Sequence, residues 1–229
     1  MRTLEKRLDK HMEVLMARYP VLGDIRVELV RAYLLLESAY ENGGKLLIAG
    51  NGGSAADAGH MAAELMKRFH LPRPLRRELT EGLLAADAVR GAYLAGVLEQ
   101  PLPAAALDGC GPFATAYLND VGGSGIFAQQ ILGLGKAGDV FLGISTSGSS
   151  ENVIYAAVTA QALGMRTIAL TGAGGGPLAA AVELAVRAPA QETELVQELH
   201  LPIYHCWCRM LEERFFGKPD KETDDDAEI

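Results

Sequence analysis

Hydrophobic residues recur at helical spacing over residues 3–18 and 24–42, and Pro20 with Gly23 separates the two segments. This pattern predicts a helical hairpin over residues 1–44. Beyond it, short apolar runs alternate with helix-forming stretches, and the runs cover residues 44–50, 101–107, 139–145, 166–172 and 183–189. Such alternation predicts an α/β fold, a three-layer sandwich in which helices flank a central, mostly parallel five-stranded sheet.

A long helical pattern over residues 194–216 closes the predicted domain, which spans residues 45–217. Gly217 and Pro219 then interrupt the pattern, because glycine and proline end helices. The remaining residues, 218–229, are mostly acidic, and their composition predicts a disordered, solvated tail.

Charge and composition narrow the classes of partner. The 229 residues carry a formal net charge of −8, which argues against a general nucleic-acid-binding surface. No apolar run approaches the roughly 20 residues that span a bilayer, and the first 20 residues mix charge with apolar positions, so we expect a cytoplasmic protein with neither membrane nor nucleic-acid partners. The three cysteines, Cys110, Cys206 and Cys208, form no C-x-x-C pair, and we expect them to be packing residues.

Two glycine- and serine-rich turns follow predicted strands. The first contains Asn51, Gly52, Gly53 and Ser54, and the second runs from Ser145 to Ser150. Each leads into a helix, whose N-terminal N–H groups and dipole favour an anion such as phosphate. The alternative is that Ser54 and Ser150 are ordinary N-caps. Neither turn matches a dinucleotide or P-loop motif, so a sugar phosphate suits the pattern better.

His60 and Glu64 lie four residues apart on the helix that follows the first turn, and therefore on one face. Together with Gln197, His200 and His205 on the last helix they offer groups for metal binding or proton transfer. A plain surface pair remains the alternative for His60 and Glu64. Residues 197 and 205 stand about 12 Å apart along a straight helix, although Pro202 between them offers a kink.

Five segments in order, "GNGGSAADAGHMAAEL", "NDVG", "GISTSGSSENV", "LTGAGGGPLA" and "VQELHLPIYH", resemble the sugar isomerase (SIS) domain family and, within it, the phosphoheptose isomerases. The resemblance runs from about residue 45 to 216. It implies a homotetramer that interconverts sedoheptulose 7-phosphate and D-glycero-D-manno-heptose 7-phosphate, an aldose–ketose isomerisation through an enediolate that supplies heptose for surface glycans.

The resemblance also implies roles for individual residues. Glu64 resembles the catalytic base and His205 its proton-transfer partner, and one zinc ion per subunit is implied at His60, Glu64, Gln197 and His205. The positions that match substrate-binding residues are Asn51, Gly52, Gly53, Ser54, Asn119, Asp120, Ser145, Thr146, Ser147, Ser150 and Gln197.

The sequence departs from the family pattern in two places. A helical insertion occupies residues 70–100, where a solvated helix face is the preferred interpretation of Arg73, Arg76 and Arg77, and phosphate binding the alternative. Glu194 stands where the family carries Asp. Two other functions remain open: a non-catalytic SIS protein similar to the replication initiator-associating protein, and a sensor or enzyme of the family that takes another sugar phosphate. Glu64 and His205 favour an enzyme over a scaffold, which has no chemical need for them.

Overall fold

The described part of the protein begins with helices and then alternates strands with helices. The computed structural model describes residues 4–107 and 109–218. The helices are α1 (Lys6–Arg18), η1 (Pro20–Ile25), α2 (Arg26–Glu41), α3 (Gly53–Met66), α4 (Arg77–Ala86), α5 (Ala88–Val97), α6 (Pro112–Asp120), η2 (Gly123–Gly125), α7 (Ile126–Leu134), α8 (Glu151–Ala162), α9 (Gly176–Ala180) and α10 (Thr193–Phe216). The strands are β1 (Leu46–Gly50), β2 (Ala104–Ala106), β3 (Val140–Ser145), β4 (Arg166–Thr171) and β5 (Leu184–Arg187).

The five strands form one sheet in the order β2-β1-β3-β4-β5, and every pairing is parallel. The predicted fold class is therefore confirmed, and each strand lies within one of the predicted apolar runs. The chain passes from β1 outward to β2 and then returns to the other side of β1 to form β3. Ligands of open α/β sheets bind at the carboxyl ends of strands where the strand order reverses in this way, which here is the boundary of β1 and β3.

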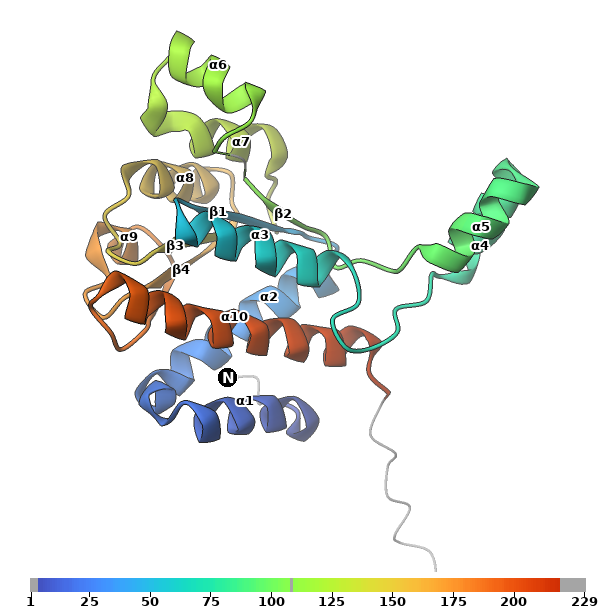
Figure 1. The fold of residues 1–229 in the computed structure, drawn as a ribbon, viewed down its shortest axis with the longest axis horizontal. Helices are drawn as coiled ribbons and strands as arrows, with labels where there is room; N and C mark the ends of the chain where they lie inside the picture. The colour runs from blue at the N-terminus through green and yellow to red at the C-terminus, as the bar shows by residue number, and fades with distance from the viewer. Residues whose placement is uncertain (1–3, 108, 219–229) are drawn as a thin grey trace, which may run out of the picture.

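Helices cover both faces of the sheet, and each face has its own core (Figure 1). Leu46 and Ile48 of β1 belong to the core that also contains residues of α1, α2, α3 and α10, while Leu47 and Ala49 of the same strand belong to the core that contains residues of α7, α8 and α9. Successive side chains of a strand point to opposite faces, so the continuous apolar run of β1 serves both cores. The two layers of helices hold the sheet, and hence its carboxyl edge, in place.

The two N-terminal helices pack against the last helix rather than standing apart as a separate hairpin. Leu8, Met12 and Leu15 of α1 are buried in the same core as α10. Trp207 of α10 is also buried, and its Nε1–H donates a hydrogen bond of 3.0 Å to the carbonyl oxygen of Leu29 in α2. The regularly spaced apolar residues that predicted these helices thus form the face that packs on the rest of the domain.

The segment predicted as an insertion contains α4 and α5, which pack on each other and project from the body of the protein (Figure 1). Gly91 makes this contact, because a Cβ there would lie 2.1 Å from the carbonyl oxygen of Leu83. The prediction for the basic residues is correct for Arg77, which is exposed and pairs with Glu81.

For Arg73 the prediction of a solvated helix face is wrong. Arg73 precedes α4, is 1% exposed, and forms a buried salt bridge with Glu212 of α10. Charge alone predicts an exposed arginine, whereas the fold supplies the buried carboxylate of Glu212 that compensates it.

Cys206 and Cys208 are buried as expected, but Cys110 is exposed in the loop before α6 and is not a packing residue. Helix α10 continues through Pro202. The predicted acidic tail lies, from residue 219 onward, outside the described residues. Within residues 4–107 and 109–218, no helix has the length and apolar character needed to cross a membrane.

Candidate active site

The two serine- and glycine-rich turns meet at the carboxyl ends of β1 and β3, which are neighbours in the sheet. Asn51, directly after β1, and Asn152, in the first turn of α8, exchange two hydrogen bonds of 2.9 Å between their side-chain amides. This reciprocal pair ties the first turn to the helix that follows the second. The structure therefore brings both predicted anion-binding turns together.

The first turn depends on its glycines. Gly52 has φ of +54°, a conformation that side chains rarely adopt, and Gly53 begins α3. A Cβ on Gly53 would lie 2.3 Å from Nε2 of Gln197, so α10 places this amide directly against the turn. Ser54 is buried inside the helix and is not its N-cap, which removes the capping interpretation for this residue.

The second turn directs hydroxyl groups toward one another. Oγ of Ser145 lies 3.0 Å from Oγ of Ser150, and the backbone N–H of Gly148 donates to Ser145 Oγ at 3.1 Å. Ser150 occupies the N-cap position of α8, yet its side chain makes no capping hydrogen bond. Ordinary capping therefore does not explain Ser150 either.

The backbone of the second turn is held by the loop after β4. Gly148 has φ of +65°, and a Cβ there would lie 2.0 Å from the carbonyl oxygen of Gly175. The carbonyl oxygen of Thr146 accepts from the N–H of Gly172 at 2.9 Å, whereas the side chain of Ser147 is exposed. The loop after β4 thus contacts the backbone of the turn, and the side chain of Ser147 is left accessible.

A cavity of about 460 Å³ lies beside these turns. Its lining includes Asn51, which follows β1, Glu151 and Asn152, which begin α8, and residues of η2 and α7. Asn119 and Asp120, two predicted substrate residues, lie at the end of α6 and hydrogen-bond to each other at 2.8 Å. Neither is among the residues that line this cavity, although the preceding residue, Leu118, is.

His60, Glu64 and His205 lie together between α3 and α10. Nε2 of His60 is 3.3 Å from Oε1 of Glu64 and 3.4 Å from Nε2 of His205. Glu64 also contacts Nζ of Lys67 at 3.1 Å. Partial burial lowers the pKa of His205, and the neighbouring His60 lowers it further while Glu64 opposes the shift. A neutral imidazole beside a carboxylate is suited to proton transfer.

A second layer, which the sequence analysis missed, supports this cluster. The phenol oxygen of Tyr204 is 3.2 Å from Oδ1 of Asp57 and 3.1 Å from Nδ1 of His60. Asp57 precedes His60 by three residues on α3, and Tyr204 adjoins His205 on α10. The helical spacing of Asp57 and His60 was a usable signal, but the contact with Tyr204 depends on how α3 crosses α10.

Three other polar residues of α10 that the sequence singled out lie outside this cluster. His200 is fully buried, and its Nε2 lies 3.2 Å from the carbonyl oxygen of Thr171. Glu194 is exposed in the first turn of the helix. Gln197 lies at the Gly53 turn and precedes His205 by two turns of an uninterrupted helix, about 12 Å along its axis.

The donor types of the cluster suit zinc. In a tetrahedral site with bonds of 2.0–2.1 Å, neighbouring ligand atoms stand about 3.3–3.4 Å apart. The two distances from His60 Nε2, to Glu64 and to His205, have these values. As placed, however, no group of three or more His, Cys, Asp or Glu side chains in the described ranges surrounds a common ion position. Three donors around one ion therefore require a change in side-chain conformation within the cluster.

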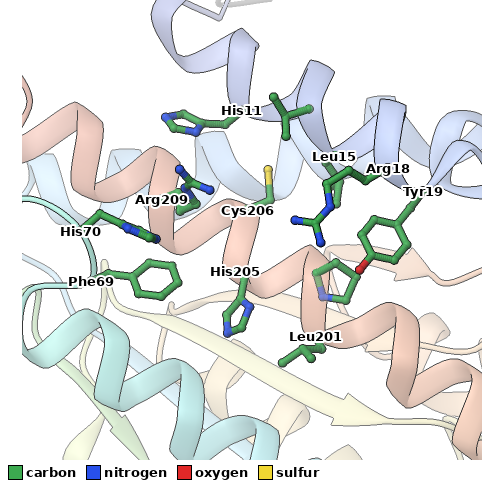
Figure 2. Close-up of a pocket in the computed structure, with 12 residues that line it drawn as sticks. His11, Leu15, Arg18, Tyr19, Phe69, His70, Leu201, His205, Cys206 and Arg209 are labelled. Atoms are coloured by element: carbon green, nitrogen blue, oxygen red, sulfur yellow. The ribbon is translucent and has the colours of Figure 1, made fainter.

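A second cavity, of about 350 Å³, lies between α1 and α10 next to His205 (Figure 2). Arg18 and Arg209 line it together with His11 and His70, and none of its lining residues is a carboxylate. Burial lowers the pKa of His11, and the charge of Arg209 lowers it further. Two arginines and two further histidines thus line the cavity beside His205.

Family models, curated relatives and solved structures all match this chain to proteins with SIS domains. A model of the SIS domain family matches residues 82–172. The phosphoheptose isomerase of Geotalea daltonii is 44% identical over 184 residues, which are 80% of this chain and 82% of that protein. The solved phosphoheptose isomerase of Neisseria gonorrhoeae has a TM-score of 0.68 and 33% identity, with 92% of this chain and all of that chain covered. The solved phosphoheptose isomerase of Francisella tularensis has a TM-score of 0.68 and 31% identity, with 91% of this chain and all of that chain covered.

The parallel sheet, the two predicted anion-binding turns at the carboxyl ends of β1 and β3, and the adjoining His/Glu cluster agree with the SIS domain class that these comparisons indicate. Within that class, the chain belongs to the phosphoheptose isomerase family.

Proposed function

We propose that this protein interconverts sedoheptulose 7-phosphate and D-glycero-D-manno-heptose 7-phosphate. The observation that carries the proposal is the pairing of a carboxylate with a histidine, Glu64 with His60 and His205, on the helix that leaves the first anion-binding turn. Aldose–ketose isomerisation needs such a pair, since one group must remove a proton from carbon and another must serve the oxygen.

The phosphate of the substrate binds at the second turn. Ser147 is exposed there, and the hydroxyls of Ser145 and Ser150 point toward each other without serving as caps. The positive end of α8 adds to the attraction. Because the phosphate does not react, its binding energy positions the sugar for proton transfer. Asn51, Gln197 and the first turn contact the sugar, and Asn119 and Asp120 take part after movement of α6.

Glu64 acts as the base that moves the proton between C1 and C2, and His205 exchanges a proton with the substrate oxygens. Each carbon proton removed by Glu64 is returned to the neighbouring carbon, so the reaction needs no external oxidant. His205 has a lowered pKa and is therefore neutral near pH 7, where it can give or accept a proton.

One zinc ion per subunit would be held by His60, Glu64 and His205, with Gln197 approaching from the first turn. The ion would supply Lewis-acid stabilisation of the developing enediolate oxygen. Chelation followed by zinc addition tests this part separately: loss and recovery of activity supports it, and full activity of metal-depleted protein excludes it.

Assembly into a homotetramer is part of the proposal. Val14 of α1 and Leu195 and Leu201 of α10 are exposed apolar residues on the helices that would form the contacts. A mass near four times 24.4 kDa by light scattering supports this assembly, and a fully active monomer contradicts it.

A panel of ketose and aldose phosphates, offered to the purified protein, tests the substrate. Conversion of sedoheptulose 7-phosphate in preference to hexose, pentose and aminosugar phosphates is the expected result. Preference for another sugar phosphate would assign a different SIS enzyme, and binding without conversion would assign a sensor or a binding protein.

A further inference from the structure

The buried phenol of Tyr204 lies between two polar groups of α3. Its oxygen is 3.2 Å from Oδ1 of Asp57 and 3.1 Å from Nδ1 of His60, and the residue is 0% exposed. A phenol has one hydrogen to donate, so it can donate to only one of these neighbours.

We propose that Asp57 and Tyr204 are positioning residues that fix the tautomer of His60. An ionised carboxylate can only accept hydrogen bonds, so the phenol of Tyr204 donates to Asp57. Its oxygen then accepts from His60, and the proton of the neutral imidazole resides on Nδ1. Nε2 of His60 is left with its lone pair.

This assignment sets the proton on the neighbouring histidine as well. Nε2 of His60 lies 3.4 Å from Nε2 of His205, and two lone pairs at that distance repel. In the metal-free protein Nε2 of His205 therefore carries a proton and donates it to His60. The chain of hydrogen bonds then runs from His205 through His60 and Tyr204 to Asp57.

The same assignment prepares His60 for a cation. Its bare Nε2 faces Oε1 of Glu64 at 3.3 Å, an arrangement that a positive ion between the two would relieve. Partners that fix the far nitrogen of a ligating histidine typically contribute 10–100-fold to metal affinity. Only this effect on metal affinity rests on the proposed function. The tautomer of His60 itself is set without metal or substrate.

Nitrogen-15 NMR of histidine-labelled, metal-depleted protein at pH 8 tests the inference directly. Two-bond nitrogen–proton correlations distinguish the two neutral tautomers of His60, and the proposal expects the Nδ1–H form. Both Tyr204→Phe, which removes the acceptor, and Asp57→Ala, which frees the phenol to donate to His60, should shift His60 toward the Nε2–H form.

Zinc affinity gives a second readout, through competition with a chromophoric chelator. Tyr204→Phe should raise the dissociation constant by about 10–100-fold while leaving the fold intact. Tyr40→Phe is the matched control, because it also removes one phenol hydrogen bond, to the carbonyl oxygen of Pro103 at 3.2 Å, away from the histidines. It should change neither readout.

An Nε2–H tautomer of His60 in the unaltered protein would overturn the inference, as would unchanged tautomer in both folded variants. If Tyr204→Phe does not fold, Asp57→Ala decides alone. Failure of the proposed isomerase function would appear instead as absence of turnover with the tautomer pattern intact, so the two failures are distinguishable.

Discussion

Nε of Arg73 lies 2.9 Å from Oε1 of Glu212, in a salt bridge whose side chains are 0% and 1% exposed. The same guanidinium donates to the carbonyl oxygens of Leu65 at 2.6 Å and Glu64 at 3.2 Å, and Glu212 accepts from the backbone N–H of Phe69 at 2.7 Å. A residue at the start of the insertion thus fastens the end of α3, which carries Glu64, to α10, which carries His205.

Replacement of Arg73 should therefore be costly. Arg73→Met leaves the carboxylate of Glu212 buried and unpaired, and removing one partner of a buried pair typically costs about 3–5 kcal/mol. Urea unfolding measures this loss. Arg77→Ala is the matched control, since the exposed pair with Glu81 is expected to contribute less than about 1 kcal/mol. Equal stabilities of the two variants would show that the buried bridge does not fasten the helices.

Gly53→Ala should affect the substrate more than the fold. The new Cβ would meet the end of the Gln197 side chain, which is flexible and can move away, so the free energy of unfolding should change by less than about 1 kcal/mol. The displaced amide should raise KM. Gly59→Ala on the same helix meets nothing within 4 Å and should leave KM unchanged. Steady-state kinetics with both variants makes the comparison, and an unaltered KM in Gly53→Ala would separate Gln197 from the substrate.

Ser147→Ala should weaken phosphate binding. A hydrogen bond to a charged group is worth about 1.5–3 kcal/mol, so KM and the inhibition constant of inorganic phosphate should rise by roughly 10–100-fold. Ser149→Ala, at the neighbouring exposed serine, should change neither constant. Unchanged constants for Ser147→Ala would remove this side chain from the phosphate site.

Acid should destabilise the protein through His200. Burial lowers the pKa of this histidine from 6.5 to about 4, although the carbonyl of Thr171 opposes the shift. Between these values the unfolded chain binds a proton that the native state does not, so stability is full above pH 6.5 and falls as the pH drops toward 4. The loss from this group between pH 7.5 and pH 5 should be about 2 kcal/mol.

Denaturant unfolding at the two pH values, on the unaltered protein and on His200→Gln, isolates this contribution. Other groups titrate over the same range, and the difference between the two proteins removes them. A smaller pH dependence in His200→Gln is expected, because glutamine has no proton to gain. Identical pH dependence in both proteins would assign the acid sensitivity to other residues.

Much of the fold follows from short-range pattern. The run over residues 44–50 is apolar throughout because β1 is covered on both faces, and that continuity predicted a parallel strand. The run over residues 101–107 gave a strand of only three residues, Ala104–Ala106, since Pro101 and Pro103 have no N–H for a ladder. The two turns were predictable because their chemistry is local to each strand end.

The arrangement of the site depends on contacts distant in sequence. The charge of Arg73 predicted an exposed side chain. It is buried because it pairs with Glu212, which lies 139 residues away in the sequence. Tyr204 contacts Asp57 across 147 residues, at a helix crossing that periodicity does not specify. The assignment of Gln197 and His205 to one set came from the family resemblance, because two helical turns, about 12 Å, separate these residues along α10. Composition alone does not distinguish the exposed Cys110 from the buried Cys206 and Cys208.

The central claim is that Glu64 is the base of an isomerase, and the turnover of Glu64→Gln on sedoheptulose 7-phosphate tests it most directly. Glutamine keeps the size of the side chain but cannot accept the carbon-bound proton, so kcat should fall by roughly a hundredfold or more while substrate still binds. Wild-type turnover in this variant, at substrate concentrations that saturate the site, would contradict the account.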